Sequence, residues 1–187
     1  MNRTKWTSIA ASVAVLLIAV NPAQAASPQV GDTAADFNLK TPTGDPVQLA
    51  NLLKEGPVVL VVLRGWPGYQ CPICTTQVGE LIGKSQDLQD AKAKVVLVYP
   101  GPSTGLNDHA QEFAKGKSLP ANFSFVTDPD YVFTKKYDLR WDAPKETAYP
   151  STFVIDPQGK VVFAKISPSH GGRAKTADVI ASLKTIK

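Results

Sequence analysis

Short apolar runs, separated by polar or Pro/Gly-containing turns, make up most of the sequence after residue 25. Residues 57–63 (Pro-Val-Val-Leu-Val-Val-Leu) are apolar and rich in β-branched side chains, which predicts a strand buried on both faces. The apolar runs 95–99 and 123–127 predict two further strands. Residues 152–155 and 160–165 predict a pair of strands joined by a tight turn. A sheet is therefore expected at the centre of the fold.

Apolar residues at helical spacing lie between and after these strands. One helix face is expected after the first buried strand, running to about Asp90, and it consists of Cys74, Val78, Leu81, Ser85 and Leu88. Shorter helices are expected over 49–54, around 106–113 and over 130–137. A last helix at the C-terminus has as its expected buried face Val179, Ile180, Leu183 and Ile186.

This order of elements is typical of an α/β fold. Alternating strands and helices predict parallel strands, because crossover connections are right-handed, and the final tight turn predicts an antiparallel pair. Residues 36–40 and a short strand around Val47 form a hairpin before the sheet core. We expect one domain over 26–187, with a central mixed sheet flanked by helices. Residues 138–149 have no periodicity, and such long loops in compact domains are often functional.

The first 25 residues are typical of a secretory signal peptide. Arg3 and Lys5 give a basic start, residues 9–20 are apolar, and Ala23-Gln24-Ala25 is a typical cleavage site. We predict cleavage that leaves Ala26 at the N-terminus and a periplasmic or secreted protein without a stable membrane anchor. A retained membrane anchor is the alternative.

Charge adds little to this picture. The formal net charge is +4, and removal of the signal peptide takes away two of its positive charges and no negative ones. No cluster of lysines and arginines suggests nucleic-acid binding, so no nucleic-acid partner is expected.

The only two cysteines, Cys71 and Cys74, follow the buried strand 57–63 directly and form a Cys-x-x-Cys motif. So short a loop stabilises the fold little as a disulfide, so redox chemistry is the better interpretation. Pro72 suits the first position of a helix, which places Cys71 at the helix N-terminus, where free amides and the helix dipole favour a thiolate. Cys74 lies one turn further along the apolar face, where burial raises the pKa of a thiol.

Several segments together resemble the redoxin group of the thioredoxin-fold superfamily, in particular the alkyl hydroperoxide reductase/thiol-specific antioxidant family and its peroxiredoxin-like relatives. They are the Cys-x-x-Cys motif, Tyr-Pro-Ser-Thr-Phe-Val-Ile-Asp at 149–156 with Gln158-Gly159, and Phe-Val-Thr-Asp-Pro-Asp at 125–130 with Lys136-Tyr137. The resemblance implies a thioredoxin-like fold with a redoxin-type N-terminal hairpin and insertion. It also implies that Pro150 is a cis-proline facing the cysteines; an ordinary proline that starts a strand is the alternative.

The resemblance to peroxiredoxins is incomplete at the reactive residues. Peroxiredoxins carry Pro-x-x-x-(Thr/Ser)-x-x-Cys around the peroxide-attacking cysteine, and Pro67, Cys71 and Cys74 match that spacing with Cys71 in the Thr/Ser position. The family also places an arginine three residues before the strand phenylalanine, where this chain has Pro150. Arg64 could replace that arginine only with a different geometry.

Three functions remain open. The leading one is an exported thiol–disulfide oxidoreductase of antioxidant, redoxin type, in which Cys71 attacks a protein or small-molecule disulfide, Cys74 resolves the mixed disulfide and an external thiol reductant resets the pair. The second is a thiol peroxidase in which Cys74 attacks a hydroperoxide. The third is a copper-binding module with His170 as the third ligand.

No cofactor or metal is expected for either enzymatic function. The residues expected to border the thiols as a substrate-binding surface are Trp66, Pro67, Tyr69 and Tyr149. Arg64 and His170 are expected accessory residues, although His170 also fits a solvated loop.

Overall fold

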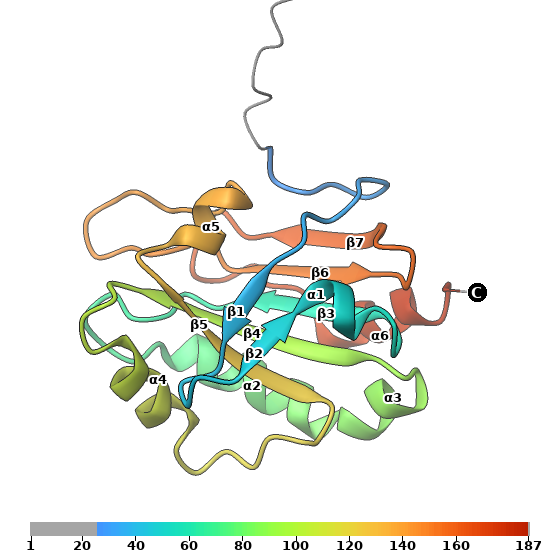
Figure 1. The fold of residues 1–187 in the computed structure, drawn as a ribbon, viewed down its shortest axis with the longest axis horizontal. Helices are drawn as coiled ribbons and strands as arrows, with labels where there is room; N and C mark the ends of the chain where they lie inside the picture. Colours follow the sequence, from blue (N-terminus) through green and yellow to red (C-terminus); the bar gives the residue numbers. More distant parts are fainter. Residues whose placement is uncertain (1–25, 187) are drawn as a thin grey trace, which may run out of the picture.

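The computed structural model describes residues 26–186, so the expected signal peptide lies outside the described residues. Seven strands form one sheet in the order β2-β1-β5-β4-β3-β6-β7 (Figure 1). The strands are β1 (Asn38–Lys40), β2 (Pro46–Gln48), β3 (Val58–Val62), β4 (Lys94–Gly101), β5 (Phe123–Pro129), β6 (Ser151–Ile155) and β7 (Val161–Ile166). The helices are α1 (Leu49–Leu52), α2 (Pro72–Gly83), α3 (Ser85–Asp90), α4 (Leu106–Ala114), α5 (Val132–Lys136) and α6 (Thr176–Leu183).

The sheet is mixed, as the sequence predicts. Strand β4 pairs in parallel with β3 and β5, whereas β6 pairs antiparallel with β3 and β7. The β1–β2 hairpin extends the sheet antiparallel to β5. The expected α/β fold is confirmed, and the unit β3–α2–β4 followed by β6–β7–α6 has the thioredoxin-like arrangement.

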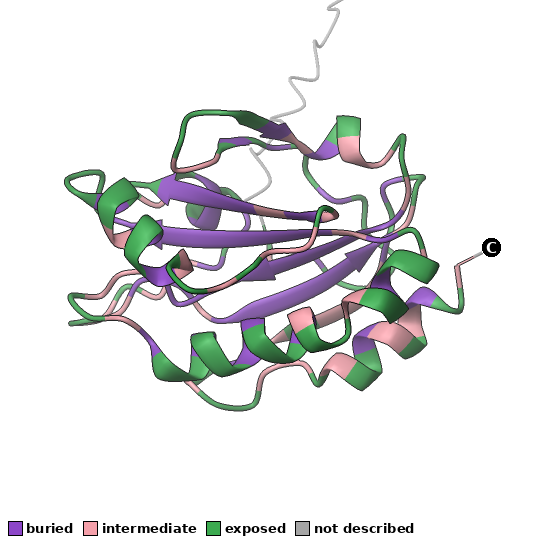
Figure 2. Ribbon diagram, turned by 90° about the horizontal axis from the view of Figure 1, so that it is seen from below, coloured by how far each residue is buried: buried purple, intermediate pink, exposed green. Residues whose placement is uncertain are grey.

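The sheet separates two apolar layers, and β3 contributes to both. Val59 and Val61 pack in the layer covered by α2, α3, α4 and α6, whereas Leu60 and Val62 pack in the layer covered by α1, α5 and the hairpin. Figure 2 shows the central strands buried and each covering helix exposed on its outer side. The uninterrupted apolar sequence of β3 thus follows from burial on both faces.

One predicted helix is two helices in the structure. The helix after the cysteines breaks at Lys84, whose φ of −110° and ψ of 19° lie outside the helical region. Gly83 precedes the break, and glycine has low helix propensity. Leu88 in α3 still packs in the same layer as Val78 in α2. The expectation of one continuous helix to Asp90 is therefore wrong, although its buried face is largely retained.

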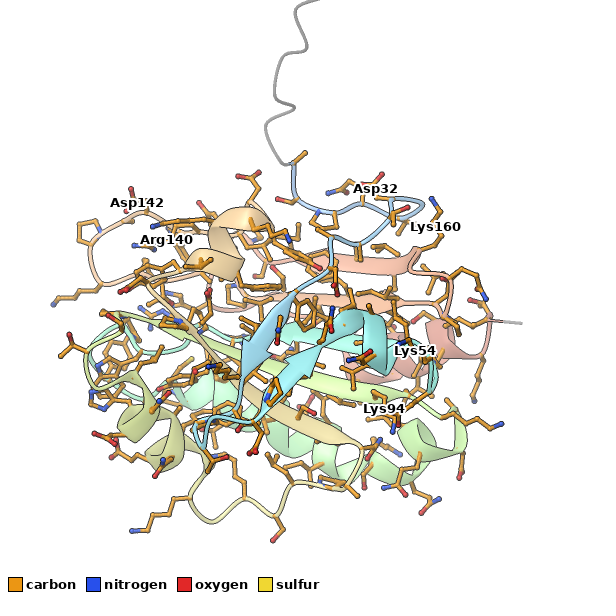
Figure 3. The ribbon with its side chains drawn as sticks, viewed as in Figure 1. Asp32, Lys54, Lys94, Arg140, Asp142 and Lys160 are labelled. Carbon is orange, nitrogen blue, oxygen red and sulfur yellow. The ribbon has the colours of Figure 1, made fainter. Side chains whose placement is uncertain are left out.

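The loop between α5 and β6 is organised by Arg140, which Figure 3 labels beside Asp142. Its guanidinium donates hydrogen bonds to the carbonyl oxygens of Glu146 (3.2 Å), Thr147 (2.6 Å) and Trp141. Arg140 also forms an isolated antiparallel bridge with Ala148. The loop is therefore a defined turn that holds Glu146 in place.

None of the helices within residues 26–186 is both long enough and apolar enough to cross a bilayer.

Candidate active site

The loop between β3 and α2 is fixed by contact with the end of β4. The amide of Trp66 donates to the carbonyl oxygen of Pro100 (2.9 Å). Gly65 has a φ of +70°, and a Cβ atom there would lie 1.9 Å from the same oxygen, so only glycine fits. Further along, the Tyr99 hydroxyl donates to Gln70 Oε1 (2.8 Å). Hydrogen bonds to β4 therefore fix the segment before Cys71 at both Trp66 and Gln70.

Cys71 and Cys74 are free thiols at the start of α2, and they are 3% and 1% exposed. Cys71 is the N-cap residue, and its Sγ accepts a hydrogen bond from the Cys74 amide (3.3 Å). Pro72 follows at the first helical position, as expected. The Sγ of Cys74 accepts a hydrogen bond from the Arg64 amide (3.4 Å).

The surroundings of the two thiols shift their pKa values in opposite directions. The pKa of Cys71 is lowered to about 6, chiefly by a hydrogen bond from the Cys74 thiol, with smaller help from the Cys74 amide, Arg173 and Arg64 against the effect of burial. Burial raises the pKa of Cys74, and its interaction with Cys71 raises it further. These surroundings thus favour ionisation of Cys71 before Cys74.

Arg173, which the sequence analysis missed, contacts both sulfurs. Its Nη2 lies 3.3 Å from Cys74 Sγ and 3.7 Å from Cys71 Sγ. The same guanidinium donates from Nη1 to Gln77 Oε1 (2.7 Å) and from Nε to the carbonyl oxygen of His170 (3.0 Å). The loop after β7 therefore brings a positive charge to the thiols, although Pro150 occupies the usual position of the family's arginine.

The Arg64 side chain points to a different partner. Its Nε donates to Glu146 Oε2 (2.8 Å), its Nη2 to the carbonyl oxygen of Lys145 (2.7 Å) and its Nη1 to the Tyr69 hydroxyl. The hydrogen bonds from Arg64 and His170 lower the pKa of Glu146 despite its partial burial. Arg64 thus reaches Cys74 through its backbone, while its guanidinium ties the motif to the 138–149 loop.

His170 does not contact the thiols. Its Nε2 lies 2.9 Å from Glu146 Oε1, and its ring lies beside Trp141 with centroids 5.3 Å apart. The alternative of a solvated loop histidine agrees with its 40% exposed side chain, and its ring contacts the Glu146 carboxylate and not the cysteines. It remains close to the site through its carbonyl oxygen, which holds Arg173.

The predicted substrate-binding residues occupy different surroundings. Tyr69 is 45% exposed, and Pro67 is half-buried. Trp66 is half-buried and stacks on His109 with centroids 3.6 Å apart. Tyr149 stacks on Trp141 at 4.9 Å. Tyr69 and Pro67 thus leave surface open beside the motif, whereas Trp66 and Tyr149 each pack one ring face against another ring.

Pro150 lies at the sheet edge expected from the sequence, but its peptide bond is trans. Within the described residues no peptide bond is cis. Ser151, which follows it, pairs with Val62 at the end of β3, so Pro150 enters β6 beside the start of the cysteine loop. The expectation of a cis Tyr149–Pro150 bond is therefore wrong: the chain enters the strand with the isomer that X–Pro bonds ordinarily favour.

The metal-binding alternative finds little support in the geometry. No group of three or more His, Cys, Asp or Glu side chains in residues 26–186 is placed to hold a metal ion.

A cavity of about 470 Å³ lies away from the thiols, between the β1–β2 hairpin, α4 and the end of β5, and neither cysteine lines it. The thiol pair is thus the centre of the candidate site.

Comparison with known proteins agrees with this geometry. The model of the AhpC/TSA family matches residues 30–164. A protein of Mycobacterium tuberculosis that is named provisionally as a peroxiredoxin is 27% identical over 161 residues, which cover 85% of this chain and 98% of that protein. The thiol-disulfide oxidoreductase ResA of Bacillus subtilis is 28% identical over 132 residues, which cover 71% of this chain and 64% of ResA.

Solved structures support the fold. The crystal structure of peroxidoxin BcpB from Mycobacterium tuberculosis superposes with a TM-score of 0.66 at 24% identity, covering 86% of this chain and 99% of that one. A yeast mitochondrial 1-Cys peroxiredoxin superposes with a TM-score of 0.67 at 19% identity, covering 83% of this chain and 75% of that one. The chain therefore has the thioredoxin-type fold of these peroxiredoxins.

Proposed function

We propose that this chain, which belongs to the AhpC/TSA family and is a thiol-dependent oxidoreductase, catalyses thiol–disulfide exchange. In this proposal the exchange takes place in the periplasm or outside the cell, and Cys71 is the nucleophile. The single observation that carries the proposal is the placement of the two thiols. Cys71 is the N-cap residue of α2, and its Sγ accepts a hydrogen bond from the Cys74 amide (3.3 Å), whereas Cys74 is 1% exposed one turn further along; these surroundings lower the pKa of Cys71 and raise that of Cys74. The thiolate is the attacking form of cysteine, so Cys71 attacks first.

The exchange proceeds in two steps. The Cys71 thiolate attacks one sulfur of a substrate disulfide, which forms a mixed disulfide and releases the other sulfur as a thiolate. Cys74 then attacks Cys71 Sγ, which forms the Cys71–Cys74 disulfide and releases the remaining substrate thiol. An external thiol reductant returns the pair to its reduced form. Tyr69 and Pro67, which leave surface open next to the motif, are the proposed contacts for the substrate.

A second candidate, thiol peroxidase activity, is favoured by one specific observation. Arg173 Nη2 lies 3.3 Å from Cys74 Sγ, which supplies a guanidinium at the cysteine that matches the peroxiredoxin spacing. In that reaction the Cys74 thiolate attacks a hydroperoxide, takes one oxygen to become a sulfenic acid and releases an alcohol or water. Cys71 then condenses with the sulfenic acid to form the disulfide and water.

A side-by-side assay of the reduced protein separates the two candidates. Equal amounts of protein are mixed with hydrogen peroxide or with a model disulfide such as oxidised glutathione, and the initial rates of loss of the protein's own two thiols are compared by mass spectrometry. We expect faster reaction with the disulfide, and loss of that reaction in the Cys71→Ser variant. Faster reaction with peroxide, together with a sulfenic acid at Cys74 in Cys71→Ser, would establish the peroxidase instead.

The compartment is tested separately. Export is supported by the basic start, apolar run and Ala23-Gln24-Ala25 site of the first 25 residues. Mass spectrometry of the protein recovered from the periplasm or medium is expected to give a chain that begins at Ala26. A chain that begins upstream of Ala23 would contradict cleavage.

A further inference from the structure

Arg173 lies outside the part of the chain that the family model covers, which ends at residue 164. It nevertheless makes the only contacts from a guanidinium to the cysteine sulfurs within residues 26–186, 3.3 Å to Cys74 and 3.7 Å to Cys71. Gln77, which is buried, and the His170 carbonyl oxygen hold the guanidinium from two other directions. A charge fixed in this way is part of the thiol site.

Because Arg173 contacts both sulfurs, it can stabilise a thiolate at either cysteine. In the reduced protein Cys71 carries the negative charge, and this charge is one of the causes that raise the pKa of Cys74. Arg173 acts in the opposite direction and lowers it. Once Cys71 has formed a mixed disulfide its negative charge is gone, so the guanidinium and the Arg64 amide, 3.4 Å from Cys74 Sγ, then face Cys74 without competition.

We propose that Arg173 is a catalytic residue for the resolving step: it stabilises the thiolate that Cys74 must form after Cys71 has reacted with the substrate. The inference rests on the proposed thiol–disulfide exchange. The guanidinium is the shared counter-ion of both sulfurs, and its stabilising effect passes from Cys71 to Cys74 as the reaction proceeds. Arg173 thereby favours ionisation of this buried thiol at the step that needs its thiolate, after Cys71 has entered the mixed disulfide.

The Cys71 thiolate attacks the substrate disulfide RS–SR′, so a Cys71–SR bond forms, the RS–SR′ bond breaks and R′S⁻ leaves. The Cys74 thiol then loses its proton to solvent, and its thiolate remains paired with Arg173. This thiolate attacks Cys71 Sγ, which forms the Cys71–Cys74 bond and expels RS⁻. The protein dithiol is oxidised by two electrons and the substrate disulfide is reduced by two.

Stopped-flow reaction of the mature protein with the chromogenic disulfide dithionitrobenzoate separates the two steps, since each releases one coloured thiolate. The measurement is made at about pH 8, above the pKa of about 6 for Cys71, to which Arg173 is one of the smaller contributors. There Arg173→Met is expected to change the first phase by no more than about threefold. The second phase is expected to slow by about 10- to 100-fold, the scale of a lost charge-assisted hydrogen bond. The mixed disulfide should then accumulate and be detected by mass spectrometry.

Two further variants serve as comparisons. Arg173→Lys keeps the charge but not the planar fork, so its second phase is expected between those of the wild type and Arg173→Met. Lys175→Gln removes an exposed charge two residues away and is expected to leave both phases within about twofold of wild type. Thermal unfolding of each variant verifies that it is folded.

An equilibrium measurement tests the same point without turnover. In Cys71→Ser, the pH dependence of Cys74 alkylation gives the pKa of Cys74 free of the Cys71 charge. Adding Arg173→Met should raise that pKa by about one unit or more. An unchanged pKa, a second phase that does not slow, or two phases that slow equally would each overturn the role of Arg173 in resolution. Failure of the wild type to release any thiolate through Cys71 would instead overturn the proposed function.

Discussion

Two sides of the thiol pair differ in both sequence separation and chemistry. The motif side, residues 64–77, is continuous in sequence and supplies the sulfurs, the helix N-terminus and the fixed loop. The remote side consists of residues 138–150 and 167–175. It supplies Glu146, 82 residues from its partner Arg64, and Arg173, which is 99 residues from Cys74 and 102 from Cys71, while His170 bonds to Glu146. The reactive atoms are thus local, whereas Arg173 and Glu146 come from distant loops.

The two sides make different contributions to the thiol site. The motif side alone gives Cys71 its largest stabilisation, through the Cys74 thiol and amide. The remote side adds Arg173 to the sulfurs and neutralises Arg64 with Glu146, so that the two arginines near the thiols have separate partners. Changes on the motif side should therefore abolish chemistry, and changes on the remote side should alter rates, pH dependence and stability.

The largest effect is expected on the motif side. Cys71→Ser should lower disulfide turnover by about 1000-fold or more, because the nucleophile is lost. Cys74→Ser should also block turnover but trap mixed disulfides with substrate at Cys71. Both variants should stay folded, since so short a loop contributes little stability. Non-reducing gels and mass spectrometry measure the trapped species; turnover retained in the double variant would contradict the account.

On the remote side, Glu146→Gln should destabilise the protein. It weakens the hydrogen bonds of Arg64, which is 2% exposed, and leaves that charge without its carboxylate partner. We expect the free energy of unfolding to fall by about 1.5–3 kcal/mol, the range for a hydrogen bond to a charged group. Denaturant unfolding of the reduced protein measures the change.

A matched control is Glu55→Gln, which removes the ion pair between exposed Glu55 and half-buried Lys94. That pair should contribute no more than about 1 kcal/mol. Equal losses in Glu146→Gln and Glu55→Gln would show that the Arg64–Glu146 pair is no more important than a surface contact, and the contrast between the two sides would fail.

A smaller effect concerns pH. The Cys71 thiol has a pKa of about 6 in the folded protein against an ordinary value of 9.0, so between these values the unfolded chain binds a proton that the folded protein lacks. The free energy of unfolding of the reduced protein should therefore rise with pH in this window, and the contribution should disappear as pH falls through about 6. Urea unfolding of the wild type and Cys71→Ser at about pH 5 and about pH 8 tests this. A pH-independent difference would contradict the shifted pKa.

The same two sides explain what the sequence could predict. Periodicity and the position of Pro72 placed the cysteines at the strand-to-helix junction, because those signals are local. Arg173 was missed because no local pattern connects it with the thiols; the hairpin β6–β7 brings it there. One signal was available: Arg173 lies only three residues after His170, which the sequence indicates as an accessory residue of the site.

Two predictions were wrong because each depended on tertiary structure that the local sequence does not determine. A resemblance to other proteins suggested a cis bond before Pro150, but the isomer depends on how the chain enters β6, which residue identity alone does not determine. The helix after the cysteines was expected to continue to Asp90, because apolar spacing persists across a bend when both segments pack in the same layer. The break at Lys84 leaves Leu88 buried and therefore leaves little trace in the pattern.

The central claim is that Cys71, and not Cys74, is the thiolate of the reduced protein. The most direct measurement is alkylation of the reduced protein by iodoacetamide over a range of pH, with the modified cysteine identified by peptide mass spectrometry. The account predicts modification at Cys71 with a midpoint near pH 6, and little at Cys74 until far higher pH. Modification of Cys74 first, or of both cysteines together near the ordinary thiol value, would contradict it.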